Sequence, residues 1–344
     1  MLFCQLGHAF SLREISGGLR SCEGKLKHLG INAPAKSSLA YANEHRPWQL
    51  YQLLFLQLLD RCHSQFDLGK NKFRFKNKLV SLDSTIIDLC LEIFNWAHYR
   101  RTKGAVKLHL LLDHDGYLPS FAVITEGKVS DIEIARQFKF PVDTIVVYDR
   151  GYTDYELFGN WTFEFVYFVT RMKDNAVYQV IRKNKVDPKR PILKDEIIEL
   201  RGSGAFEKCP YQLRRIEYYN AAKQEILVFL TNHLKLAAST IAAIYQDRWQ
   251  IELFFKALKQ NLKIKTFVGT SANAVKIQIW TALIAMLILR FLQLRSSYNW
   301  SLSNLVAILR MNLFTHRDLW AWLDQPYNVL PIEYESEQLK LNLI

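Results

Sequence analysis

Four residues in the last third of the chain have the types and spacing to act on a phosphate backbone. They follow the pattern Y-x2-R-x3-E-x6-K and are Tyr245, Arg248, Glu252 and Lys259. At about 100° per residue, a helix would place all four in one narrow sector. Glu252 can ligate a metal ion, while Arg248 and Lys259 can hold phosphates. A solvated helix face with ordinary salt bridges has similar spacing, so this segment alone does not decide between the two.

The segment IAAIYQDRWQIELFFKALKQNLK is predicted to form one continuous amphipathic helix. Its apolar residues recur at helical spacing beside the polar sector: Ile251, Phe254, Phe255, Leu258 and Leu262. A second apolar stretch, residues 277–292, contains Gln278 and Arg290 and is short for a membrane span. We expect it to be a buried helix packed behind the first.

Two aspartates end apolar strands of the predicted sheet. Asp83 closes LVSLD and Asp149 closes TIVVYD. If these strands are neighbours and the helix with Glu252 packs across them, three carboxylates converge at an edge where sites are commonly built. Such a cluster is costly unless divalent cations occupy it. Each aspartate alone is more often a turn residue or a helix cap, so the prediction rests on their occurrence together with Glu252.

The surrounding elements predict a mixed α/β (α+β) fold. Residues 1–66 have a helical pattern, and Ser11-Leu-Arg-Glu14 has the form of a capping box for a short helix ending near Gly17-Gly18. Strands are expected at 75–87, 105–113, 117–125 and 144–148, with a helix at 131–138. The predicted domains are an N-terminal helical, DNA-binding domain (1–70), a first core part (71–160), a β-rich insertion (161–235), a second core part (236–325) and a C-terminal tail (326–344).

Composition favours a folded protein that binds a polyanion. The 344 residues carry a formal net charge of +12, and nucleic acid is the first partner that such an excess suggests. The five cysteines form no C-x-x-C pair and the nine histidines form no metal-binding cluster, which favours a reducing cytoplasm. No signal peptide is evident, and no membrane partner is expected.

In this order, LDST, YDRGY and the Y-x2-R-x3-E-x6-K pattern resemble the bacterial insertion-sequence transposases with the YREK signature. That family of cut-and-paste enzymes carries a DDE catalytic core on a ribonuclease-H-like fold. Its second aspartate lies on the fourth strand, and a β-rich insertion precedes the helix with the glutamate. The resemblance covers residues 3–325. It implies a ribonuclease-H-like mixed sheet flanked by helices.

The resemblance also implies an activity. Asp83, Asp149 and Glu252 would be the metal-binding triad, holding two Mg2+ ions for which Mn2+ can substitute. The reaction would be hydrolysis at the element ends, followed by attack of the free 3′-hydroxyl on target DNA. The partner is double-stranded DNA, both terminal inverted repeats and target, held by a dimer. The location is the bacterial cytoplasm, at the nucleoid.

Six further residues receive DNA-contact roles, of differing strength. By resemblance, the terminal phosphates are gripped by Tyr245, Arg248 and Lys259. Trp249 is a candidate for stacking on a displaced base, with core packing as the favoured alternative. Lys107 and His109 alternate along one strand, and they are candidates for facing DNA or supporting the site.

The chain departs from the family pattern at its start. Relatives usually have more residues upstream, in a region that helps to recognise terminal repeats, and the apolar MLFCQL has no cap. We therefore expect a chain that begins inside a helix and recognises element ends poorly. Two alternatives stay open: a nuclease of the same fold, and a catalytically silent DNA-binding remnant.

Overall fold

A single mixed sheet organises the computed structural model, which describes residues 1–65, 72–100 and 103–328. Among these residues the sheet has ten strands in the order β2-β3-β1-β5-β6-β10-β9-β8-β7, with β4 also paired to β3. The strands are β1 (Leu79–Leu89), β2 (His98–Arg100), β3 (Lys103–Asp113), β4 (Leu118–Glu126), β5 (Ile145–Tyr148), β6 (Tyr167–Arg171), β7 (Tyr178–Lys183), β8 (Ile192–Leu200), β9 (Leu213–Asn220) and β10 (Glu225–Thr231).

Five strands, in the order β4-β3-β1-β5-β6, make a ribonuclease-H-like sheet. β3 is antiparallel to both β1 and β4, whereas β1 and β5, and then β5 and β6, are parallel. The predicted fold class, a mixed sheet flanked by helices, is therefore confirmed. The register pairs Leu82 with Tyr148, so the next residue on each strand, Asp83 and Asp149, lies at the same level of the sheet.

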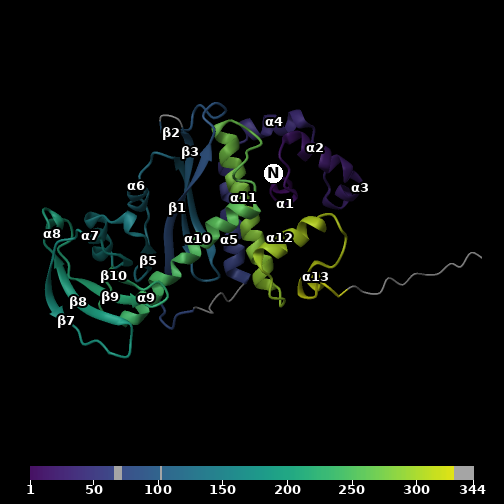
Figure 1. Cartoon of the computed structure of the whole chain (residues 1–344). Helices are drawn as coiled ribbons and strands as arrows, with labels where there is room; N and C mark the ends of the chain where they lie inside the picture. The colour runs from purple at the N-terminus through teal and green to yellow at the C-terminus, as the bar shows by residue number, and fades with distance from the viewer. Residues whose placement is uncertain (66–71, 101–102, 329–344) are drawn as a thin grey trace, which may run out of the picture.

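Helices cover both faces of this sheet (Figure 1). They are α1 (Leu2–Gly7), α2 (Leu12–Ser21), α3 (Glu23–Leu26), the 3-10 helix η1 (Lys27–Leu29), α4 (Lys36–His45), α5 (Gln49–Gln65), α6 (Asp131–Ala135), the 3-10 helix η2 (Arg150–Tyr152), α7 (Tyr155–Phe163), α8 (Ala205–Lys208), α9 (Ala238–Asp247), α10 (Trp249–Asn261), α11 (Ala272–Arg295), α12 (Leu302–Met311) and α13 (Leu319–Asp324).

Alternation along the strands separates the two faces. Odd-numbered residues of β1, such as Ile87 and Leu89, pack in one cluster with α5, α10 and α11, and Leu79 packs with α9. Even-numbered residues, Val80 and Leu82, pack with α6 and α7 on the opposite face. The face that carries α9 and α10 is therefore also the face toward which Asp83 points.

The predicted β-rich insertion, residues 161–235, shares the sheet with the core. The predicted range includes β6, which is the fifth strand of the core sheet and pairs with β5. The other strands, β10, β9, β8 and β7, continue outward from β6. These strands form the lobe with α8 at the left of Figure 1. The core and the insertion are thus joined by continuous strand pairing.

The N-terminal helices follow the predicted pattern with one correction. Ser11 caps α2 by accepting a hydrogen bond from the backbone of Glu14, whose side chain accepts one from the amide of Phe10. The expected end at Gly17-Gly18 was wrong, because α2 continues to Ser21. Two glycines cost a helix about 1 kcal/mol each and do not by themselves end it.

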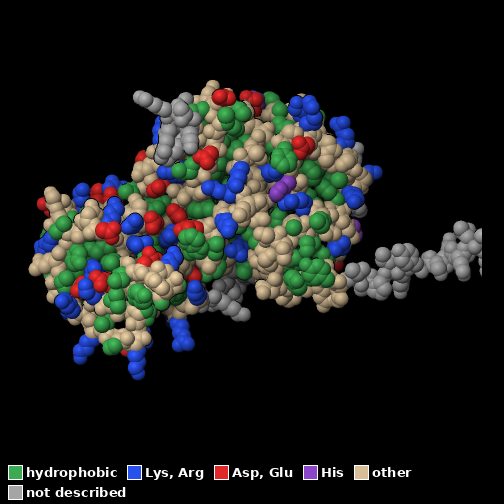
Figure 2. Space-filling model, in the orientation of Figure 1, with side chains coloured by type: hydrophobic (Ala, Val, Ile, Leu, Met, Phe, Trp, Pro, Cys, Tyr) green, Lys and Arg blue, Asp and Glu red, His purple; other side chains and the backbone are tan. Residues whose placement is uncertain are grey.

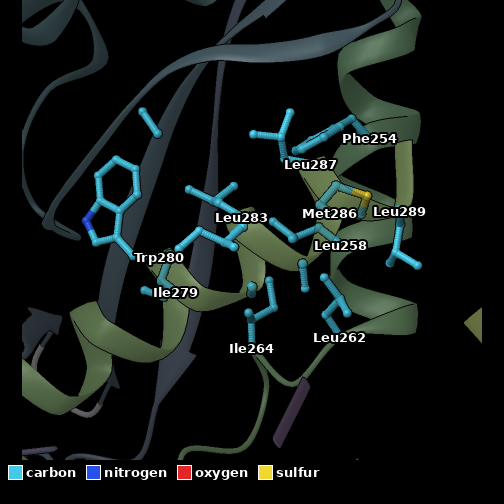
Figure 3. Packing of buried hydrophobic residues seen from close by; sticks show 14 of the residues in the cluster. Phe254, Leu258, Leu262, Ile264, Ile279, Trp280, Leu283, Met286, Leu287 and Leu289 are labelled. Atoms are coloured by element: carbon cyan, nitrogen blue, oxygen red, sulfur yellow. The ribbon is translucent and has the colours of Figure 1, made fainter. Parts of the chain in front are cut away.

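Helix α11 is the hydrophobic centre of the structure, as predicted for residues 277–292. Figure 3 shows its Leu283, Met286 and Leu287 against Phe254 and Leu258 of α10. Burying each such side chain is worth about 2 kcal/mol. Among the described residues α11 is the one helix long and apolar enough to cross a membrane, but 78% of its most apolar window is buried inside the fold.

The motif segment is not one continuous helix. Helix α9 ends at Asp247 and α10 begins at Trp249, with Arg248 between them. The backbone of Arg248 keeps helical angles (φ −49°, ψ −32°), but its carbonyl accepts from Ile251, three residues on. Both side chains at the break contact residues that are distant along the chain. Asp247 accepts hydrogen bonds from Lys72, His114 and Tyr117, and Arg248 lies near Asp83. Amphipathic spacing gave no sign of this tight turn.

Candidate active site

Asp83 lies on the central strand β1, beside the ends of α9 and α10. Its Oδ1 accepts a hydrogen bond from the backbone of Ser84 at 2.8 Å. Its Oδ2 lies 3.7 Å from the guanidinium of Arg248. The side chain is 20% exposed, so one edge of the carboxylate remains open to solvent.

Asp149 follows β5 immediately and caps the short helix η2. Its Oδ2 accepts from the backbone of Gly151 at 3.3 Å, and its Oδ1 accepts from the hydroxyl of Tyr245 at 3.3 Å. Burial raises the pKa of Tyr245 to about 12, so this hydroxyl keeps the proton that it donates. An open hollow of about 560 Å³ adjoins Asp149 and is lined by Arg150, Gly151, Lys173, Asp174 and Asn175.

Glu252 reaches the same region from the first turn of α10. Its Oε1 lies 2.7 Å from the guanidinium of Arg248, and its side chain is 32% exposed. Arg248 therefore stands between Glu252 and Asp83, and it also lies 5.4 Å from the ring of Tyr245. The residues that the sequence predicted as the triad lie on one face of the sheet.

The electrostatics of this cluster show that the carboxylates interact. Burial raises the pKa of Asp83 to about 6, and the charges of Glu252 and Asp149 raise it further, against the amide of Ser84 and the charge of Arg248. Hard oxygen donors of this kind suit a divalent cation. In the described part of the chain, however, no three Asp, Glu, His or Cys side chains are spaced to hold a metal ion. The donor chemistry fits such an ion, whereas the spacing requires the groups to close around it.

Lys259, the last motif residue, and Trp249, which follows the motif arginine, differ in how free their side chains are to contact DNA. Lys259 Nζ donates to the backbone carbonyl of Ile86 at 2.9 Å, which fixes it against β1. Trp249 is 53% exposed, so the core-packing alternative was wrong for this residue. Its indole lies on the surface, next in sequence to Arg248.

Lys107 and His109 are not brought together with the three carboxylates. They alternate with the β3 residues that pack against α10 and α11, so they face the opposite side, where both are buried. Lys107 Nζ lies 3.3 Å and His109 Nδ1 lies 3.4 Å from Asp131 of α6. Burial lowers the pKa of His109 to about 4, which leaves it neutral at physiological pH.

The expectation that Lys107 and His109 face DNA was wrong. Buried side chains bonded to α6 are not presented to DNA. They connect to the region of the site through Asp131, which also accepts a 2.7 Å hydrogen bond from Ser84, the neighbour of Asp83. Sequence reasoning placed Asp131 only at the start of a predicted helix and gave it no role at the site.

A second buried network was also missed. Asp247 accepts from His114 at 2.7 Å, from Tyr117 at 3.1 Å and from Lys72 at 2.7 Å. The other ring nitrogen of His114 lies 2.6 Å from the hydroxyl of Ser81. The network ties the α9–α10 break to β1 two residues before Asp83. Its only signal in the sequence was that Asp247 precedes the motif arginine.

Known proteins similar to this chain agree on its family. The family model described as "Transposase DDE domain" matches residues 74–288, and one described as a domain of unknown function (DUF4372) matches residues 1–32. A protein of Sinorhizobium fredii described as a transposase, y4zB, is 31% identical over 306 residues, covering 87% of this chain and 83% of that protein. A protein of Geobacillus stearothermophilus, described as a transposase for the insertion sequence element IS5377, is 29% identical, covering 77% of this chain and 69% of that protein.

Among solved structures, a piggyBac transposase synaptic complex with hairpin DNA aligns with a TM-score of 0.39 at 10% identity, covering 74% of this chain and 55% of that one. The family match spans well over half of the 344 residues, from the strand with Asp83 to the helix behind Glu252. The DDE domain implies dependence on a divalent metal and DNA as the partner. The chain belongs to the bacterial insertion-sequence transposases of the DDE family, enzymes that act on DNA.

Proposed function

We propose that this transposase cleaves DNA at the ends of its insertion sequence and joins the freed 3′ ends to target DNA, in a Mg2+-dependent reaction. The observation that carries the proposal is the meeting of Asp83 and Asp149 at one level of adjacent parallel strands, with Glu252 packed across them. Three carboxylates and one arginine on one face of the sheet, two of the carboxylates partly exposed, suit a metal-assisted phosphodiester reaction.

In this proposal Asp83, Asp149 and Glu252 hold two Mg2+ ions, or Mn2+ in their place. When bound, such ions supply activation of a water or a 3′-hydroxyl and stabilisation of the leaving oxygen. The protein contributes the positions of the carboxylates. Ser84 and Gly151 orient two of them through backbone amides, and the hydroxyl of Tyr245 orients Asp149.

The phosphates of the element end would be bound by Arg248, Lys259 and Tyr245, the YREK residues other than the glutamate. Arginine suits phosphate because its planar fork can donate two parallel hydrogen bonds. The exposed indole of Trp249 is available to stack on a base at the same point. The open hollow of about 560 Å³ beside Asp149 leaves this part of the site reachable from solvent.

The wider surface is consistent with a polyanionic partner. Figure 2 shows Lys and Arg side chains scattered across the visible face, with acidic side chains among them, and the net charge is +12. Because paired cutting of two element ends requires two active sites, we propose that a dimer assembles on DNA. Action on a bacterial chromosome would take place in the cytoplasm, at the nucleoid.

The test is Mg2+-dependent nicking of a labelled duplex that carries the inverted repeat flanking the gene, with wild type and Glu252→Gln compared. Glu156→Gln is the matched control, because Glu156 is 53% exposed and lies on α7, on the other face of the sheet. We expect wild type and the control to nick the duplex and Glu252→Gln to lose about 10³-fold or more in rate.

Each other outcome has a defined meaning. Nicking that persists in Glu252→Gln would refute the assignment of the triad. Binding without nicking by wild type would identify a silent DNA-binding remnant. Nicking without joining of paired ends would favour the nuclease alternative.

A further inference from the structure

Arg248 occupies the position between two carboxylates that the proposed function assigns to metal binding. Its guanidinium lies 2.7 Å from Glu252 and 3.7 Å from Asp83. The residue is only 9% exposed, yet its Nε has no hydrogen-bond partner among the described residues. Of its five donor hydrogens, few are well used. This arginine is therefore buried beside anions without being fully satisfied by them.

Asp247, the residue before Arg248, is held firmly in place, unlike Arg248. The carboxylate of Asp247 is 1% exposed and receives three hydrogen bonds, from His114, Tyr117 and Lys72. His114 in turn contacts Ser81 on β1. The backbone at the α9–α10 break is thereby anchored to the strand that carries Asp83. Any exchange of partners by Arg248 can then occur through its long side chain, without movement of the helix.

A guanidinium at this point must compete with a divalent cation. The guanidinium and a metal cation would repel each other strongly at close range in a partly buried site. The Oε1 atom of Glu252 cannot accept the hydrogen bond from Arg248 and ligate the metal at full strength at the same time. Among the described residues, no three His, Cys, Asp or Glu side chains are close enough to hold a metal ion, which agrees with this competition. A DNA phosphate would offer Arg248 a better-matched partner, since phosphate oxygens can accept in a bidentate manner.

We propose that Arg248 is an exchangeable counter-ion that couples metal binding to DNA binding. Without DNA it neutralises Glu252 and Asp83 and holds metal affinity low. When a DNA phosphate takes the guanidinium, both carboxylates are released to close around the cations. The inference rests on the proposed function and adds its regulation: the site assembles with metal only on DNA. By thermodynamic linkage, metal must then strengthen DNA binding by the same factor.

The test measures Mn2+ binding by electron paramagnetic resonance, which needs no turnover, in the absence and presence of a 20-base-pair duplex. We compare wild type with Arg248→Gln. Arg150→Gln is the matched control, because it removes an equal charge beside Asp149 from a side chain whose ion-pair partner is Asp174. We expect Arg248→Gln to bind Mn2+ about tenfold more tightly than wild type without DNA. We expect DNA to raise the Mn2+ affinity of wild type and of Arg150→Gln by a similar factor, and not that of Arg248→Gln.

The possible failures are distinguishable. If Arg248→Gln binds Mn2+ no more tightly than wild type, or keeps the full effect of DNA, the coupling role is refuted and the proposed function stands. If no protein binds Mn2+ even on DNA, both are refuted. Should Arg248→Gln fail to fold, the wild-type measurement still decides, because Mn2+ affinity that is independent of DNA contradicts the proposal.

Discussion

Asp83→Asn should stabilise the metal-free protein while removing a residue that the proposed reaction requires. Burial, with added repulsion from Glu252 and Asp149, raises the pKa of Asp83 from 3.8 to about 6. At about 1.4 kcal/mol for each pKa unit, ionising this carboxylate in the folded protein costs about 3 kcal/mol relative to the unfolded chain. The amide of asparagine has a similar shape and carries no charge, so it avoids that cost.

The stabilisation should depend on pH in one direction. Above pH 7, Asp83 is ionised in both states and the folded wild type bears the whole cost. As pH falls through about 6, the folded state binds a proton and the cost declines, and below 3.8 both states are protonated and no difference remains. The advantage of Asp83→Asn is thus about 3 kcal/mol at pH 8 and close to zero near pH 4.

The assay is urea unfolding in EDTA at pH 4, 6 and 8 for wild type, Asp83→Asn and Asp88→Asn. Asp88 lies on the same strand but is exposed, so its substitution should change the free energy of unfolding by less than about 0.5 kcal/mol. An Asp83→Asn protein that is less stable than wild type at pH 8, or whose advantage does not shrink with falling pH, would refute the conclusion that burial makes the ionised Asp83 destabilising.

Three further outcomes are expected. Burial opposes ionisation of Asp247, but hydrogen bonds from His114 and Lys72 outweigh it and lower its pKa to about 2; Asp247→Asn should therefore lose about 2 kcal/mol of stability at pH 7, a loss that shrinks as pH falls from 4 toward 2. Unchanged urea midpoints would contradict the anchoring role. Gly159→Ala should destabilise by about 1–3 kcal/mol, because its new Cβ would clash with the backbone oxygen of Lys208; an unaffected midpoint would show that α7 and α8 can separate freely. Trp249→Ala should leave stability unchanged but weaken binding of a fluorescent duplex by about 1–3 kcal/mol, as measured by anisotropy, and equal affinity would remove Trp249 from the DNA surface.

Local pattern was sufficient for most elements near the site. The strand before Asp149 was predictable from its β-branched apolar run, and a strand containing Asp83 was expected at 75–87. The expectation that Asp83 ends its strand was wrong, because β1 continues to Leu89 through pairing with β3. The capping box at Ser11 and the buried helix α11 followed from equally local signals. Helix boundaries were predicted less well. Helix α2 continues past the glycine pair at which it was expected to end, and the helix expected to be continuous is interrupted at Arg248.

The sequence by itself determined which residues are available for chemistry: two aspartates that follow apolar runs, a glutamate on a helix, and cations at helical spacing beside it. Only the tertiary structure decided their relations. Alternation places Lys107 and His109 on one face of their strand, but the pairing of β3 with β1 and the packing of α10 decide that this face is turned away from Asp83. The contact of His114 with Asp247 joins residues 133 apart, and Arg248 meets Asp83 across a comparable distance along the chain. Such contacts arise from the packing of helices on a sheet, which buries apolar surface and brings charged groups together as a consequence, and no local periodicity records them.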